Sequence, residues 1–141
     1  MLRIGKVKAH AASKIELARL LTAAERVLAD ADVTGLSSDS RLDLAYRAIM
    51  QAALAAMLAN GYRPSTSEPG HHQLLIQALP KTAGIAAERV RVLDAYRAMR
   101  NQADYLGIPV SDAVAKECVV EARAVVQQVR AWLDAHRPDF S

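Results

Sequence analysis

The sequence predicts an all-α fold, an antiparallel up-and-down bundle of about five helices in a single domain that spans residues 1–141, with its core at about 13–135. Composition is the first reason: 52% of residues are hydrophobic, mostly Ala, Leu and Val, with one Phe and one Trp. Alanine and unbranched side chains lose little rotamer freedom in a helix. The second reason is that five segments with helical periodicity alternate with short turns, and no segment predicts a strand.

The first two helices carry clear boundary signals. Ser13 and Glu16 have capping-box spacing before an apolar stripe of period 3.6. The second helix runs from about Ser40 to Asn60 and is apolar around nearly its whole circumference, which favours a central position among neighbouring helices. Gly61 can take the left-handed conformation that ends a helix, and Pro64 prevents the helix from resuming.

Three further helices follow. A short one around "HHQLLIQAL" is expected to stop at Pro80, and the next runs from about Ile85 to Leu106 and ends at Gly107. The last starts at the predicted cap Ser111 and continues to about residue 135. The apolar side of the fourth helix is Leu93, Tyr96, Met99 and Ala103. The stripe of the fifth is Ala115, Cys118, Ala122, Val125, Val129, Trp132 and Leu133.

Charge and cysteine content restrict the class of protein. The net charge of +3 is too small to prove nucleic-acid binding, although four arginines fall between residues 89 and 100. One cysteine excludes an intramolecular disulfide framework, and Cys118 lies on an apolar stripe, where a small inert core residue is expected. The first ten residues lack the apolar core of a signal peptide, and the run "AIMQAALAAMLA" is shorter than the ~20 residues of a membrane span. We therefore expect a soluble, cytoplasmic protein that does not enter a membrane.

Common catalytic and metal motifs are absent. The sequence has no glycine-rich phosphate loop and no G-x-S-x-G elbow. Glu68 and His71 have the Glu-x-x-His spacing of a di-iron bundle, but Pro69 and Gly70 between them predict a turn. His71 and His72 are adjacent, so they do not share a helix face, and they are interpreted as surface histidines at a helix start. We expect neither a bound metal nor a cofactor.

The stretch "YRAMRNQADYLG" concentrates polar side chains on the fourth helix. They are Arg97, Arg100, Asn101, Asp104 and Tyr105, all within about two turns. Three interpretations remain open: a surface Arg100–Asp104 pair with Tyr105 packed on the next helix, a buried Arg–Asp pair with Tyr105 hydrogen-bonded inside one protomer, or a site where the arginines bind phosphate or carboxylate.

Two stretches resemble the HEPN-domain family. They are "AYRAIMQAALAAMLANGYRP", an aromatic-led, Ala-rich helix that ends in Gly, and "RAMRNQADY", which is similar to the Arg-bearing late helix of the family. The resemblance implies a helical bundle from a prokaryotic toxin–antitoxin or defence pair. It also implies a homodimer with a composite ribonuclease-like site at its interface, and a nucleotidyltransferase encoded nearby as the antitoxin.

The resemblance assigns roles to individual residues. Arg97 and Arg100 would contact a phosphate of RNA or a nucleotide, and Asn101 and Asp104 would orient it. Family ribonucleases carry Arg, four to six intervening residues and then His, whereas here Tyr105 follows Arg100 after four residues. An unperturbed Tyr titrates near 10, so it is a poor base at neutral pH, and ribonuclease activity is expected to be weak or lost. Tyr105 would then be a polar contact, or the acceptor when a partner nucleotidyltransferase adds AMP. The alternative is a non-catalytic interaction module that binds a nucleotide or a protein.

Overall fold

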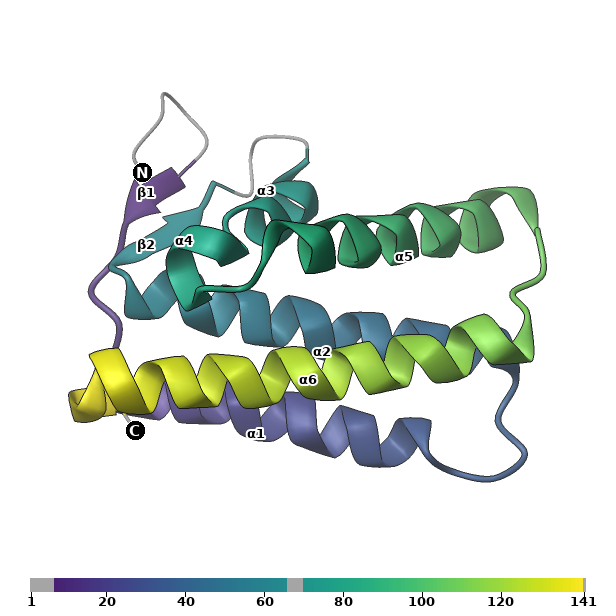
Figure 1. Ribbon diagram of the computed structural model, residues 1–141, viewed down its shortest axis with the longest axis horizontal. Helices are drawn as coiled ribbons and strands as arrows, with labels where there is room; N and C mark the ends of the chain where they lie inside the picture. Colours follow the sequence, from purple (N-terminus) through teal and green to yellow (C-terminus); the bar gives the residue numbers. More distant parts are fainter. Residues whose placement is uncertain (1–6, 66–69, 141) are drawn as a thin grey trace.

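The computed structural model describes residues 7–65 and 70–140, and within them the chain folds mainly into helices (Figure 1). The elements are β1 (Val7–Ala9), α1 (Lys14–Ala31), α2 (Ser38–Ala59), β2 (Tyr62–Pro64), α3 (His71–Gln77), α4 (Leu79–Ala83), α5 (Ala87–Leu106), α6 (Asp112–His136) and a 3₁₀ turn, η1 (Pro138–Phe140). The four long helices alternate in direction along the chain. The prediction of an all-α helical bundle is therefore confirmed.

Helix α2 lies at the centre of the bundle, as its apolar circumference predicted. It packs most extensively against α1 and α6, and α3, α4 and α5 cover its remaining upper side (Figure 1). Seven of its alanines have no exposed surface, and these small side chains let the neighbouring helices approach its backbone closely. They are Ala45, Ala48, Ala52, Ala53, Ala55, Ala56 and Ala59.

By length and composition α2 alone, among the described helices, could cross a membrane. However, 72% of that apolar stretch is buried against the rest of the chain, as in the core helix of a soluble protein.

Serine caps begin three of the four long helices, α1, α2 and α6. The hydroxyls of Ser13, Ser37 and Ser111 each accept a hydrogen bond, 3.1 Å long, from the backbone N–H three residues later. The caps predicted at Ser13 and Ser111 are confirmed. The capping box is not completed, because the Glu16 carboxylate binds the His10 ring instead of turning back to the Ser13 backbone.

Replacing Ser111 with alanine is expected to lower the free energy of unfolding by about 1 kcal/mol, because an N–H of the first turn of α6 loses its acceptor. Urea denaturation measures the change. Ser111→Asp keeps a capping oxygen and should stay within about 0.5 kcal/mol of the wild type. Equal losses in both variants would contradict a capping role.

The expectation that the chain forms no strand is wrong. β1 and β2 pair antiparallel, with Lys8 opposite Arg63, and His10 N–H extends the pairing to the carbonyl of Gly61 over 2.8 Å. Gly61 has φ +90°, so it ends α2 as predicted and turns the chain back into β2. Two three-residue strands more than fifty residues apart are too short to produce a period-2 pattern, which explains why the sequence did not predict them.

Pro80 also acts differently from the prediction. It does not end the helical region but lies in the first turn of α4, immediately after α3. A proline is well accommodated there, because its ring fixes a helical φ and its missing N–H has no partner in a first turn. Gly84, with φ +66°, ends α4.

The last two long helices differ in how much they bury. In α6 every residue of the predicted stripe is buried except Trp132, which is half-buried. In α5 only Leu93 and Tyr96 are buried, since this helix packs mainly against α2 and α3 and leaves most of its circumference exposed. The polar cluster predicted on α5 therefore lies on the least covered long helix.

Candidate functional site

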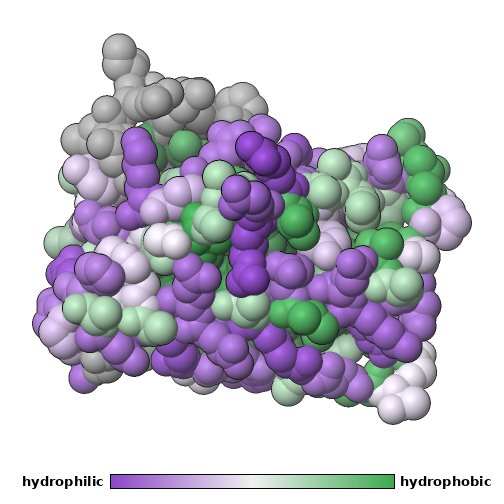
Figure 2. Space-filling view, in the orientation of Figure 1, coloured by the Kyte–Doolittle hydropathy of each residue, from purple (hydrophilic) through white to green (hydrophobic). Residues whose placement is uncertain are grey.

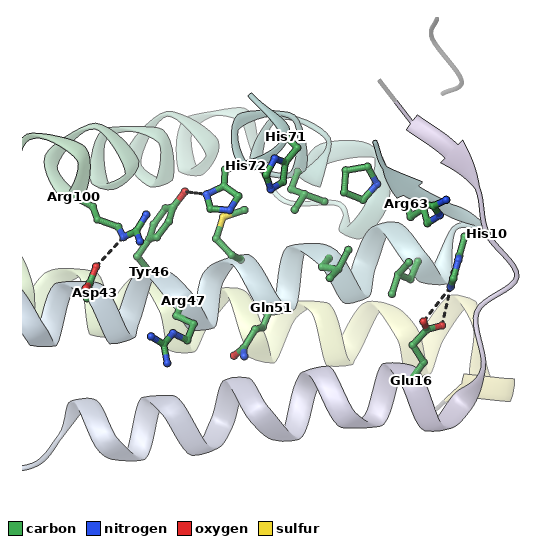
Figure 3. A pocket seen from close by; sticks show the side chains of 15 residues that line it. His10, Glu16, Asp43, Tyr46, Arg47, Gln51, Arg63, His71, His72 and Arg100 are labelled. Atoms are coloured by element: carbon green, nitrogen blue, oxygen red, sulfur yellow. Dashed lines mark hydrogen bonds and ion pairs between the residues drawn. The ribbon is translucent and has the colours of Figure 1, made fainter. Parts of the chain in front are cut away.

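A pocket of about 540 Å³ lies along the side of α2 that faces away from α6 (Figure 3). α2 forms its floor, α3 and α5 form one wall, and β2 lies at one end with the start of α1 beside it. Its apolar lining is Met50, Leu54, Leu58, Pro64 and Leu75. Its polar lining is His10, Glu16, Asp43, Tyr46, Arg47, Gln51, Arg63, His71, His72 and Arg100.

Arg100 reaches from α5 to α2 at one end of this pocket. Its Nε lies 2.8 Å from Oδ1 of Asp43 and 3.7 Å from Oδ2 of Asp104. Its guanidinium carbon lies 5.2 Å from the centre of the Tyr46 ring, a cation–π distance. Contacts on two helices therefore hold Arg100 in place, with one third of its side chain still exposed.

The other four predicted site residues do not line the pocket. Arg97 is bound to Asp94 on its own helix at 2.8 Å, and Asn101 is half-buried. Asp104 is exposed and pairs with Arg100, so the interpretation of a surface Arg100–Asp104 pair is confirmed.

Tyr105 is 83% exposed, so neither of its predicted packing arrangements is correct. It does not pack on the next helix, and it has no hydrogen bond within the described part of the chain. The last turn of α5 is poorly covered by the rest of the chain, since Leu106 beside Tyr105 is 71% exposed as well. The buried network proposed from the sequence is therefore absent at Tyr105.

Tyr46 and His72 form a second polar contact next to Arg100. The Tyr46 side chain is 2% exposed, and its hydroxyl lies 3.4 Å from Nδ1 of His72 (Figure 3). Burial raises the pKa of Tyr46 to about 12, so the hydroxyl keeps its proton and can donate a hydrogen bond to Nδ1. In neutral His72 the remaining proton then sits on Nε2. His72 can thus present an N–H donor, held in place from behind by Tyr46.

His71 and His72 lie at a helix start, as predicted, since α3 begins at His71, but they are not fully exposed surface residues. Both are half-buried and line the pocket, with ring centres 4.6 Å apart in an edge-to-face arrangement. Burial lowers the pKa of His72, and the nearby His71, Arg100 and Arg97 lower it further. The short helix α3 lies across the open side of α2, so two consecutive side chains at its start can both border the same pocket.

The opposite end of the pocket is formed by His10, Glu16 and Arg63. The His10 Nε2 lies 2.9 Å from Oε1 of Glu16, and this contact lowers the pKa of the Glu16 carboxyl. Arg63 projects from β2 beside them (Figure 3). Among the described residues, no carboxylate lies within ion-pair distance of Arg63 or of Arg47. The pocket therefore has an apolar floor and an excess of positive charge at its rim.

Such a pocket fits an anion with an apolar body better than a metal ion. No group of three or more His, Cys, Asp or Glu side chains in residues 7–65 and 70–140 is arranged to hold a metal, and Glu68 lies outside these residues. Cys118 is fully buried, and burial raises the pKa of its thiol to about 12. Cys118 is therefore an inert core residue, as predicted.

No family model matches the chain, and no curated protein is similar enough to count as a relative.

The free energy of unfolding is expected to fall as the pH drops below about 6.5. Since the pKa of His72 is lower in the folded state than its ordinary 6.5, the unfolded chain binds a proton that the folded chain does not. The contribution of His72 to the free energy of unfolding is then fully present above pH 6.5. It is lost as the pH falls toward the lower pKa that His72 has in the folded state. Urea denaturation at about pH 7.5 and about pH 5.5 should show this loss, with a smaller loss in His72→Gln. If His72→Gln lost as much stability as the wild type, the prediction would be contradicted. The lowered pKa of Glu16 also makes stability depend on pH, but at lower pH than the His72 effect.

Proposed function

We propose that this chain is the HEPN-like toxin or effector component of a prokaryotic toxin–antitoxin or defence pair, and that it binds or cleaves RNA or a nucleotide. The observation that supports this function is the arrangement of Arg100, Tyr46 and His72 at one end of the pocket. An arginine and a histidine from two different helices border the same space there. Residues of these types can bind a phosphate and transfer protons without a metal.

In this proposal His72 takes the place of the histidine that Tyr105 replaces in the motif. Arg100 binds the scissile phosphate through the part of its guanidinium that Asp43 leaves free. The ribose 2′-hydroxyl attacks the phosphorus and gives its proton to solvent water. The bond between phosphorus and the 5′-oxygen breaks, and the leaving 5′-oxygen gains a proton. The neutral His72 donor would stabilise the phosphate oxygens, and a protonated fraction could deliver a proton to the leaving oxygen.

Cleavage of RNA by the purified protein in EDTA tests this function. We expect weak cleavage that is lost in Arg100→Ala and falls by about 10²-fold or more in His72→Ala, because an acid–base group typically contributes ~10²–10⁴-fold. Arg91→Ala, which removes an exposed arginine of the same helix outside the pocket, is the matched control and should keep full activity. Cleavage that persists in both pocket variants would contradict the assignment.

A second candidate function is a non-catalytic interaction module that binds a nucleotide or a protein. Two observations favour it: Asp43 occupies one edge of the Arg100 guanidinium, and Tyr105 lies outside the pocket. This function predicts no cleavage, but nucleotide binding that Arg100→Ala weakens. An adjacent nucleotidyltransferase gene would favour the toxin–antitoxin function, and its absence would favour the module.

The proposal also includes partners. The exposed phenol of Tyr105 is accessible to a nucleotidyltransferase, which supports its role as an acceptor of AMP. Leu106 is 71% and Ile108 is 46% exposed at the same end of α5, where hydrophobic surface gathers in Figure 2, and a second copy of the chain would cover it. Mass spectrometry after co-expression with the neighbouring gene product tests the modification, and light scattering tests the homodimer. A cytoplasmic location belongs to the same proposal.

A further inference from the structure

The apolar part of the pocket has no role in the proposed cleavage, which uses only the Arg100 end. Met50, Leu54 and Leu58 follow one another at four-residue spacing on α2, over about 12 Å at a rise of 1.5 Å per residue. Helical residues four apart share a face, so these three side chains form a continuous apolar strip. Leu75 of α3 and Pro64 of β2 line the same space. The strip therefore fits an extended hydrocarbon body.

Hydrogen-bond donors meet at one end of the apolar strip. The Tyr46 hydroxyl lies against Nδ1 of His72, and the opposite edge of the imidazole, which carries the Nε2–H, is turned into the pocket (Figure 3). Within the described part of the chain, this Nε2 has no hydrogen-bond partner. Arg100 borders the same end, with one third of its side chain exposed. An anionic group that accepts hydrogen bonds fits this end.

The carboxylates that line the pocket restrict the ligand to one negative charge. Oδ1 of Asp43 lies 2.8 Å from Nε of Arg100, so it would repel the second charge of a dianion at this end. At the far end, Glu16 lines the pocket together with Arg63 and His10, and its carboxylate would repel an anion there. The ligand therefore combines one singly charged head at Arg100 with an apolar body along the strip.

We propose that the pocket binds an aliphatic carboxylic acid of medium chain length. Its carboxylate lies between the Arg100 guanidinium and Nε2 of His72, and its hydrocarbon chain lies along the apolar strip. A pocket of about 540 Å³ is within the ~300–1,000 Å³ range of small-molecule sites. This inference goes beyond the proposed function, because binding of the acid requires neither RNA nor cleavage. Both ligands use Arg100, so the acid competes with RNA for the pocket.

Calorimetric titration of the full chain with straight-chain carboxylates, from butanoate to decanoate, tests the apolar strip. We expect the affinity to rise about fourfold for each added CH₂ group, the factor for burying one such group. Leu54→Gln places a polar side chain in the strip and should weaken decanoate binding about tenfold. Leu44→Gln changes another half-buried leucine of α2 that lies outside the pocket, so this matched control should bind decanoate as the wild type does.

A comparison of octanoate, octan-1-ol and octylamine tests the charged head. We expect octanoate to bind at least about tenfold tighter than octan-1-ol, since a hydrogen bond to a charged group contributes about that factor. Octylamine should bind most weakly, because its positive charge would meet Arg100. Arg100→Gln should remove the preference for octanoate. Arg63→Gln changes the arginine at the far end and should keep it.

Three results would each overturn the inference. They are an affinity that does not depend on chain length, equal binding of octanoate and octan-1-ol, and loss of the octanoate preference in Arg63→Gln. RNA binding and cleavage, measured without acid, judge the proposed function separately. If the chain cleaves RNA but does not bind the acids, the inference alone fails. If it binds the acids but neither binds nor cleaves RNA, the inference stands and the RNA function fails.

Discussion

Ile49→Ala is expected to lower the free energy of unfolding by about 2–5 kcal/mol. Ile49 has no exposed surface and lies near the middle of α2, the helix that contacts every other long helix. The substitution removes three carbon atoms, and a close-packed interior can refill only part of the cavity. Because the free energy of unfolding of a domain is only ~5–15 kcal/mol, this substitution would remove a large fraction of it.

Chemical denaturation with a graded series measures this effect. Ile49→Val removes one methyl group and should cost about 0.5–1.5 kcal/mol. Val120→Ala serves as the surface control, because Val120 is 64% exposed on α6 and should change stability by no more than about 0.5 kcal/mol. If Ile49→Ala and Val120→Ala had equal effects, the packing around α2 would differ from the structure.

The opposite change, an enlargement, should also be harmful in α2. Ala56 is fully buried, and Ala56→Leu adds three carbon atoms where neighbouring helices lie close to the backbone. Overpacking of this kind forces strained rotamers or a shift of a helix, at a cost of about 1–3 kcal/mol or more. We expect a lower melting temperature and a lower free energy of unfolding.

The matched control for this enlargement is Ala131→Leu. Ala131 is exposed on α6, where the larger side chain projects into solvent and leucine has nearly the helix propensity of alanine. It should remain within about 0.5 kcal/mol of the wild type. A neutral Ala56→Leu would mean that α2 has free space beside it and that its alanines do not determine the helix spacing.

Local signals were sufficient for most of the fold. Capping serines such as Ser13 and Ser111 bond to a backbone N–H within one helical turn, so the helix starts that they mark can be predicted without knowledge of the tertiary structure. The same is true of Gly107, which ends α5 with φ +66°. The strands could not be predicted in this way, because Val7 and Pro64 are far apart in the sequence and meet only through the tertiary structure.

The site was only partly predictable for the same reason. Arg100 was identified from its neighbours on α5, but its partners Asp43, Tyr46 and His72 come from α2 and α3. One signal was available in the sequence: after the polar first turn of α2, the polar side chains from Leu42 to Ala59 are Asp43, Tyr46, Arg47 and Gln51. They fall on one side at helical spacing, and all four line the pocket. The sequence did not predict that α3 contributes His71 and His72 to the pocket, since the position of α3 depends on tertiary packing.

The central position of α2 has a consequence during synthesis. Its main partner on one side, α6, ends at His136, 77 residues after Ala59 (136 − 59), so a ribosome needs about 4–15 s to produce it at ~5–20 residues per second. Throughout that interval the nascent chain exposes one side of a helix that is apolar enough to enter a lipid bilayer. Chaperones that bind hydrophobic segments would act at this stage, and a chain truncated before α6 would retain that exposure permanently and aggregate.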